Sequence, residues 1–315
     1  MVEQLVVDGL EWLAGYRQLV ASGLVFSSIV ILGSIGLALV YSVGDFPNFA
    51  HGDLLTIGAY TAIVVNVMLD VHLAIGFVVA MIVTALVALG TDKLIYRPLE
   101  GKPIELLITS IGVAFAYRAL LLMGFGPGSM SYDAGGRGGI QWVRDTFGVT
   151  ITPRQAVIIL VTLVLVSALH IILQYTTLGR MMRATAENKD LARVSGIRTQ
   201  RVLAAMWLIG GALAGAGGVF LGLELVIRPR IGFSILLVLF AAVILGGIGS
   251  VYGAMLGGFV IGMAHEMAGL FGDISGALPL LPEFGSEYGA VVAFVLMILI
   301  LIVKPSGIMG GKTSA

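Results

Sequence analysis

The chain contains no cysteine and few charged residues. Of its 315 residues, only 11% are Asp, Glu, Lys or Arg, less than half of the roughly 25% found in a soluble domain. The absence of cysteine excludes disulfides, thiolate catalysis and iron–sulfur ligation. The scarcity of charge excludes a water-exposed surface around a globular protein of this size. Hydrophobic residues instead make up 58% of the sequence, and the mean hydropathy is +1.03.

Apolar runs recur along the whole sequence. Many are long enough to cross a hydrocarbon core of ~30 Å, which takes about 20 helical residues. We therefore predict an all-α polytopic membrane protein with about nine transmembrane or partly spanning helices and at least one broken helix. The predicted spans are Ser22–Val43, Gly52–Leu69, His72–Gly90, Glu105–Gly124, Pro153–Tyr175, Arg201–Leu223, Phe233–Gly246, Tyr252–Phe271 and Glu287–Val303.

Lys and Arg are unevenly distributed among the loops. With an external N-terminus and nine spans, most of them fall in loops on the cytoplasmic side, which is the usual determinant of topology. Residues 1–21 then form an extracytoplasmic N-terminal segment without the basic region of a cleaved signal. Residues 22–303 form a single transmembrane domain, and residues 304–315 form a cytoplasmic tail.

A basic loop, residues 176–200, separates the fifth and sixth predicted spans. From Ala184 to Val194 it contains neither Gly nor Pro, and Gly196 follows as a candidate C-terminal cap. We predict one surface helix there, with Lys189 and Arg193 on the face opposite Leu191 and Val194. A soluble cytoplasmic partner could push against such a helix. Alternatively, the segment is a solvated loop whose basic residues only set the topology.

Polar residues, Pro and Gly interrupt the apolar pattern between the first two spans. Such breaks at membrane depth occur only where the backbone is buried in protein or lines a cavity. A helix that restarts after Asn48 would point its positive N-terminal end into that cavity, which suits a substrate carboxylate. We therefore expect Asn48, His51, Gly52 and Asp53 on the substrate pathway. The alternative is a short loop with a solvated His51, in which Asn48 or Asp53 caps a helix.

Small residues recur at helical spacing. Gly249, Gly253 and Gly257 repeat every four residues, a pattern that predicts close helix packing in a membrane. The Gly-rich run that ends at Ser250 lacks the Lys of a phosphate-binding loop, so it predicts no nucleotide site. The ionisable residues within the spans form no recognisable pair; they are Arg118, His170, His265 and Glu266.

Four blocks of the sequence narrow the function. They are Asn48–Tyr60, Arg97–Gly112, Thr177–Asn188 and Phe240–Ser250. In this order they closely resemble the permeases of the branched-chain amino acid ABC transporters, and the resemblance covers nearly the whole chain. It implies a membrane subunit of an ATP-driven importer that is not itself an enzyme.

The resemblance also implies the partners. They are a second permease subunit that is a homologous but different chain, two cytoplasmic ATPase subunits and an extracytoplasmic substrate-binding protein. ATP and Mg would bind to the ATPase subunits, so we expect no cofactor, metal or nucleic acid on this chain, and we expect it in the plasma membrane. The basic loop resembles the coupling helix that contacts the ATPase. The residues assigned to that contact are Arg180, Arg183, Ala184, Glu187, Asn188, Lys189, Arg193 and Gly196.

Alternatives remain for the cargo and for the source of energy. Urea or an amide could replace the amino acid as cargo of the same family. An ion-coupled secondary transporter would need an intramembrane ionisable site, and the sequence shows no clear pair. An intramembrane hydrolase is disfavoured because no Ser/His pair, paired carboxylate or metal motif occurs at a useful spacing.

Overall fold

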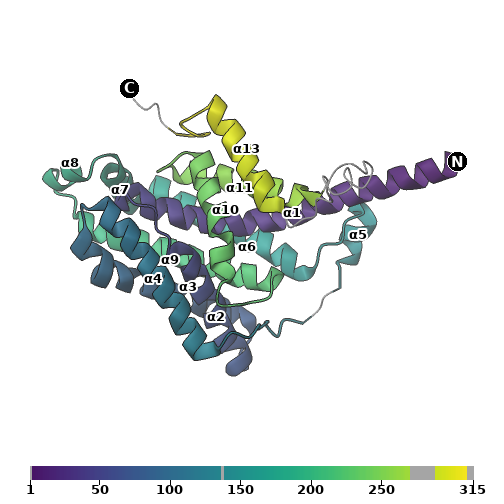
Figure 1. Ribbon diagram of the computed structural model, residues 1–315, viewed down its shortest axis with the longest axis horizontal. Coiled ribbons are helices and arrows are strands. Elements are labelled where there is room, and N and C mark those ends of the chain that lie inside the picture. Colours follow the sequence, from purple (N-terminus) through teal and green to yellow (C-terminus); the bar gives the residue numbers. More distant parts are fainter. Residues whose placement is uncertain (1, 136–137, 270–287, 311–315) are drawn as a thin grey trace.

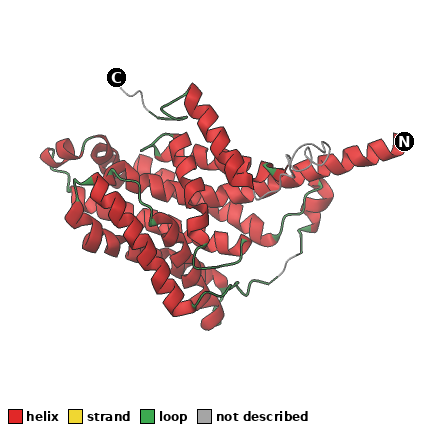
Figure 2. Ribbon diagram, in the orientation of Figure 1, coloured by secondary structure: helices red, strands yellow, loops and turns green. Residues whose placement is uncertain are grey.

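The computed structural model describes residues 2–135, 138–269 and 288–310. This part of the chain is helical, with one isolated antiparallel bridge between Met130 and Ile227 and no strand (Figure 2). The all-α polytopic fold is therefore confirmed. The predicted ends at Phe271 and Glu287, and the last residues of the tail, lie outside the described residues.

Within the described residues, five segments are long and apolar enough to cross a membrane: Gly15–Ser42, Leu73–Leu99, Pro103–Phe125, Pro153–Tyr175 and Thr199–Glu224. The helices that contain them are α1 (Val2–Gly44), α3 (Leu73–Thr91), α4 (Pro103–Phe125), α6 (Pro153–Tyr175) and α9 (Thr199–Glu224). A π-helix, η2 (Asp92–Tyr96), and a short turn, η3 (Arg97–Leu99), extend α3.

Shorter helices complete the bundle. They are α2 (His51–Ile63) with its π-helical extension η1 (Val64–Met68), α10 (Ile231–Gly246), α11 (Val251–Met267) and α13 (Gly289–Val303). The helices that connect the spans are α5 (Gln141–Phe147), α7 (Thr177–Glu187) and α8 (Lys189–Val194). Among the described residues, these elements match the nine predicted spans in order.

Helix α1 is longer than the sequence predicts. It runs unbroken for 43 residues, about 64 Å at 1.5 Å per residue, and its N-terminal end projects beyond the rest of the bundle (Figure 1). The helix begins well before the predicted start of the span at Ser22, because that start followed hydropathy. The acidic residues before Ser22 end the apolar run, but they do not stop a helix.

The centre of the bundle is built around α1 and α9. Small residues along α9 let its neighbours approach closely: a Cβ on Gly218 would meet the Leu55 carbonyl of α2, and one on Gly211 would meet Ala88 of α3. Gly210 lies against the backbone of Gly36 on α1. Close backbone approach of this kind gains dispersion contacts where lipid supplies no hydrophobic drive. By contrast, α3, α4 and α6 leave most of their apolar surface exposed.

The small residues of α11 fall into two groups. A Cβ on Gly253 or Gly257 would collide with the backbone of α10 at Gly246 or Ala242, so both glycines permit helix packing. Gly249 lies instead in the turn between α10 and α11 with φ +83°, and a Cβ added there would meet no described atom within 4 Å. The packing role predicted for Gly249 is therefore wrong, and its glycine serves the left-handed backbone of the turn.

The connecting helices occupy opposite ends of the molecule. In Figure 1, α7 and α8 lie at the end of the bundle where α1 finishes, whereas α5 lies toward the N-terminal end of α1. The basic loop and the segment around α5 therefore lie at opposite ends of the bundle. Their placement on opposite sides of the membrane stays a prediction.

Candidate functional site

The chain breaks between α1 and α2. Helix α1 ends at Gly44, Asp45 follows with φ 55°, and α2 begins at His51. The Asn48 side chain stabilises the irregular backbone: its Oδ1 accepts hydrogen bonds from the Ala50 N–H at 3.0 Å and from the Tyr96 hydroxyl at 3.3 Å. The predicted broken helix is therefore confirmed at this position.

The broken segment turns back into the middle of the bundle. His51 Nε2 lies 2.9 Å from the carbonyl oxygen of Gly33, which is about 16 Å along α1 from its end at Gly44. His51 and Asp53 are both 0% exposed. The alternative with a solvated His51 is therefore wrong, and α2 starts inside the bundle.

Helix α10 begins at the same depth. Gly232, in its first turn, lies so close to Gly52 that a Cβ on either residue would meet the carbonyl oxygen of the other. The Gly232 N–H also donates to Thr56 Oγ1 at 3.0 Å. The N-terminal turns of two short helices therefore meet inside the bundle. Helix N-termini carry partial positive charge, and discontinuous transporter helices use them at substrate sites.

A buried ion pair lies beside these helix ends. Arg118 of α4 donates from Nε to Asp53 Oδ1 at 2.8 Å and from Nη2 to Oδ2 at 3.1 Å. Its guanidinium carbon lies 4.0 Å from the centre of the Phe233 ring on α10. The sequence did not indicate this partner for Arg118, since the pairing depends on the depth at which α2 restarts, and hydropathy along the chain does not give that depth.

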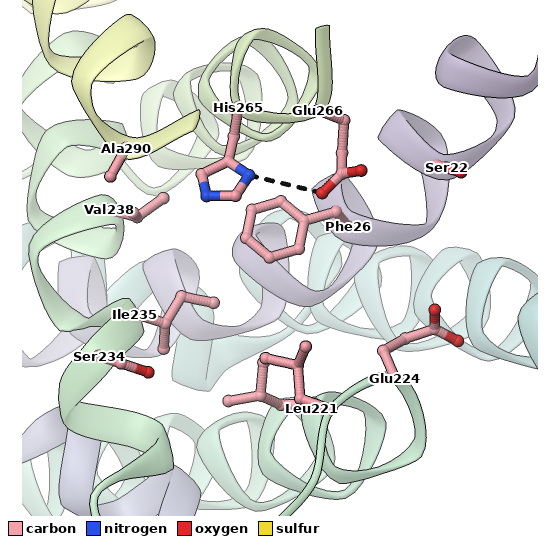
Figure 3. A pocket seen from close by; sticks show the side chains of 11 residues that line it. Ser22, Phe26, Leu221, Glu224, Ser234, Ile235, Val238, His265, Glu266 and Ala290 are labelled. Atoms are coloured by element: carbon pink, nitrogen blue, oxygen red, sulfur yellow. Dashed lines mark ion pairs between the residues drawn. The ribbon is translucent and has the colours of Figure 1, made fainter. Parts of the chain in front are cut away.

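The other intramembrane ionisable residues lie apart from this pair. His170 of α6 lies 3.0 Å from the Tyr252 hydroxyl. His265 and Glu266 of α11 line a cavity of about 440 Å³. Residues of α1, α9, α10 and α13 form the rest of its wall. Figure 3 shows the His265 ring beside Phe26, with which it stacks at 4.3 Å, and its ion-pair contact with Glu266.

The basic loop forms two helices where one was predicted. Asn188 separates α7 from α8 with an extended backbone (φ −157°, ψ 107°), and its Oδ1 accepts the Leu191 N–H at 2.8 Å. The single helix over 184–194 is therefore wrong, because Asn188 acts as an N-cap for a new helix. Gly196 follows α8 with φ +85°, the left-handed conformation that a C-terminal cap requires.

Two of the basic residues assigned to the partner contact turn toward the bundle. Lys189 Nζ and Arg193 Nη2 lie 2.8 and 2.9 Å from the same oxygen, Oε1 of Glu100, in the loop before α4. The opposite side of α8 presents two exposed apolar side chains, Leu191 at 64% and Val194 at 87% exposed, beside the Asp190 side chain, which is 92% exposed. The predicted separation of Lys189 and Arg193 from Leu191 and Val194 holds, and the apolar pair is more accessible to a partner than the two basic residues, which lie against Glu100.

The remaining residues of this assignment lie along α7 and at its end. Arg180, Glu187 and Asn188 are exposed, and Ala184 is half-buried. Arg183 donates a hydrogen bond to the Leu173 carbonyl at the end of α6. Arg183 therefore fixes α7 to α6, a role that the sequence pattern did not indicate.

Glu100 has a perturbed carboxyl group. Partial burial raises its pKa, but the hydrogen bond and charge of Lys189, together with Gln200 and Arg193, outweigh burial and hold the pKa below the usual 4.5. Glu100 is therefore ionised at neutral pH.

In the described part of the chain, no group of three or more His, Asp or Glu residues is placed to hold a metal ion.

Known proteins resemble this chain over almost its full length. The family model described as "Branched-chain amino acid transport system / permease component" matches residues 19–301. The chain is 34% identical to the high-affinity branched-chain amino acid transport system permease protein LivH of Escherichia coli K12, covering 94% of this chain and 96% of LivH. It is 32% identical to BraD of Pseudomonas aeruginosa at the same coverage. LivM of Escherichia coli K12 is 26% identical over 89% of this chain and 67% of LivM.

Proposed function

The chain belongs to the family of permease components of branched-chain amino acid transport systems, and we propose that it is the membrane subunit of an ATP-binding cassette importer. Its cargo is a branched-chain or related small neutral amino acid. The observation that carries the proposal is the exposure of two apolar side chains of α8, Leu191 and Val194, at the end of the bundle opposite α5. An exposed apolar helix face at a membrane surface fits a groove on a soluble partner.

Partner ATPases would drive this subunit through α7 and α8. ATP-dependent closure of the ATPase pair would move the two helices, and rigid-body motion of the bundle would open the pathway alternately to each side. In this proposal the N-terminus is external and the C-terminus cytoplasmic. No residue of the chain performs covalent chemistry, and ATP hydrolysis takes place on the partner.

The substrate pathway runs past the break before α2. An amino acid carries an ammonium and a carboxylate, which match the charges of Asp53 and Arg118. Two buried polar atoms beside them, Nδ2 of Asn48 and Nδ1 of His51, have no hydrogen-bond partner in the described structure and can serve substrate or water. An uncharged urea or amide has no charge to exchange for either partner of the ion pair, so the pair favours an amino acid as cargo.

A second permease completes the pathway in this proposal. The chain is similar to both LivH and LivM, whose names assign them to a transport system of the same description. We therefore expect a homologous but different chain as partner. The exposed apolar sides of α3, α4 and α6 leave room for this partner and for lipid.

The experiment tests docking at α8 by co-purification of the tagged chain with its ATPase subunits. The variants Leu191→Asp and Val194→Asp place a charge on the apolar face, and we expect either to reduce the recovered ATPase at least about tenfold, the effect of losing a central interface residue. Met309→Asp is the matched control, since Met309 is 48% exposed and lies after α13. ATPase recovery equal to wild type with both α8 variants, or substrate uptake by vesicles that lack ATPase, would overturn the proposal.

A further inference from the structure

The segment between α3 and α4 has no role in the function proposed above. It contains η3 (Arg97–Leu99), Glu100 and Gly101, whose φ of +86° turns the chain toward α4. This segment lies at the same end of the bundle as α8, and its Glu100 side chain is 29% exposed. It therefore lies between the helix pair that a partner would move and the helices that surround the pathway.

Glu100 holds α8 and the start of α9 through three contacts. Its Oε1 lies 2.8 Å from Lys189 Nζ and 2.9 Å from Arg193 Nη2, and its Oε2 accepts from Gln200 Nε2 at 3.1 Å. Two of these donors belong to successive turns of α8. One carboxylate thus fixes both the position and the rotation of α8 relative to the loop before α4.

The same segment is anchored on its other side to the broken helix. Tyr96, at the end of η2, is 3% exposed, stacks on Trp207 of α9 and donates to Asn48 Oδ1. Arg97 pairs with the buried Asp92 at 3.0 Å. From Glu100 to Asn48, the contacts therefore lead from α8 to the residue that shapes the start of α2.

We propose that Glu100 is a positioning residue that transmits the movement of α8 to the segment before α4 and so to the start of α2. The inference rests on the proposed function, because it requires that a partner ATPase moves α8. The ion pairs of Glu100 are partly exposed, and pairs of this kind contribute little to stability. Loss of the carboxylate should therefore leave the fold and the apolar docking face intact while loosening the connection between them.

The test measures substrate uptake per ATP hydrolysed by the complete transporter in vesicles. For Glu100→Gln we expect this ratio to fall about 2- to 30-fold, the range for residues that couple two sites, with unchanged recovery of the ATPase subunits. Glu105→Gln is the matched control: Glu105 lies in the first turn of α4 and is exposed, and its side chain makes no hydrogen bond or ion pair among the described residues. We expect Glu105→Gln to retain the wild-type ratio.

A double-variant comparison separates transmission from simple damage. Because Glu100 acts through Lys189 and Arg193, Lys189→Gln should lower the same ratio, and Glu100→Gln with Lys189→Gln should be less damaging than the product of the two single effects. A wild-type ratio in Glu100→Gln, or a parallel loss of ATPase recovery and uptake, would overturn the role of Glu100. Failure of the wild-type chain to recover any ATPase would instead overturn the proposed function.

Discussion

At the scale of single residues, the break before α2 determines which buried charges form an ion pair. Asp53 is 0% exposed and lies in the first turn of α2, where it pairs with Arg118 of α4. The sequence shows both residues, but it does not show that α2 starts deep in the bundle. An ionised group buried without a partner is costly, so the two charges are retained as a pair.

The pairing predicts how the two residues depend on each other. Arg118→Met leaves the Asp53 carboxylate buried without its partner, which should destabilise the folded protein by about 3–5 kcal/mol. The double variant Asp53→Asn with Arg118→Met removes both charges and should regain most of that loss. Thermal unfolding in detergent, followed by size exclusion, measures the difference. A double variant no more stable than Arg118→Met would show that the pair does not determine stability.

At the scale of helices, the sequence predicts most of the elements and misplaces a few of their ends. The start of α6 agrees with prediction at Pro153, where Thr152 and Gln155 form a capping box, a start signal that is local in sequence. The break in the basic loop was missed because Asn188 suits both a loop and an N-cap, and only the extended backbone at that residue decides between them. Glu100 binds Lys189 and Arg193 and so determines which face of α8 points away from the bundle. The sequence did not predict this contact, because Glu100 is distant from α8 in sequence.

The Asn188 cap gives a prediction for α8. Asn188→Ala removes the acceptor for the Leu191 N–H, and the loss of an N-cap costs about 1 kcal/mol. We therefore expect amide hydrogens of 189–194 to exchange about fivefold faster with solvent, measured by mass spectrometry of the purified protein. Asn188→Asp keeps a capping oxygen and serves as the control. Equal protection of these amides in Asn188→Ala and wild type would refute the capping role.

At the scale of the whole molecule, the two candidate sites lie at different depths of one helical bundle. The ends of α2 and α10 meet inside it at Gly52 and Gly232, and α8 lies at the end where α1 finishes. Composition and hydropathy predicted the class of the protein, and the four sequence blocks predicted its family. The connection between the two sites through Glu100 and Tyr96 was not predictable, because it joins segments that are distant from one another in sequence.

The most direct test of the account is the reactivity of a single cysteine on α8, which the cysteine-free chain permits. In Asp190→Cys, the new thiol lies beside Leu191 on an exposed position. We predict that a membrane-impermeant maleimide leaves it unlabelled in intact cells and labels it in inverted vesicles stripped of ATPase subunits. When those subunits are bound again, labelling should slow at least about tenfold, as expected for a residue covered by an interface. Labelling in intact cells, or equal labelling with and without the ATPase, would contradict the claim that this helix receives the driving force from inside the cell.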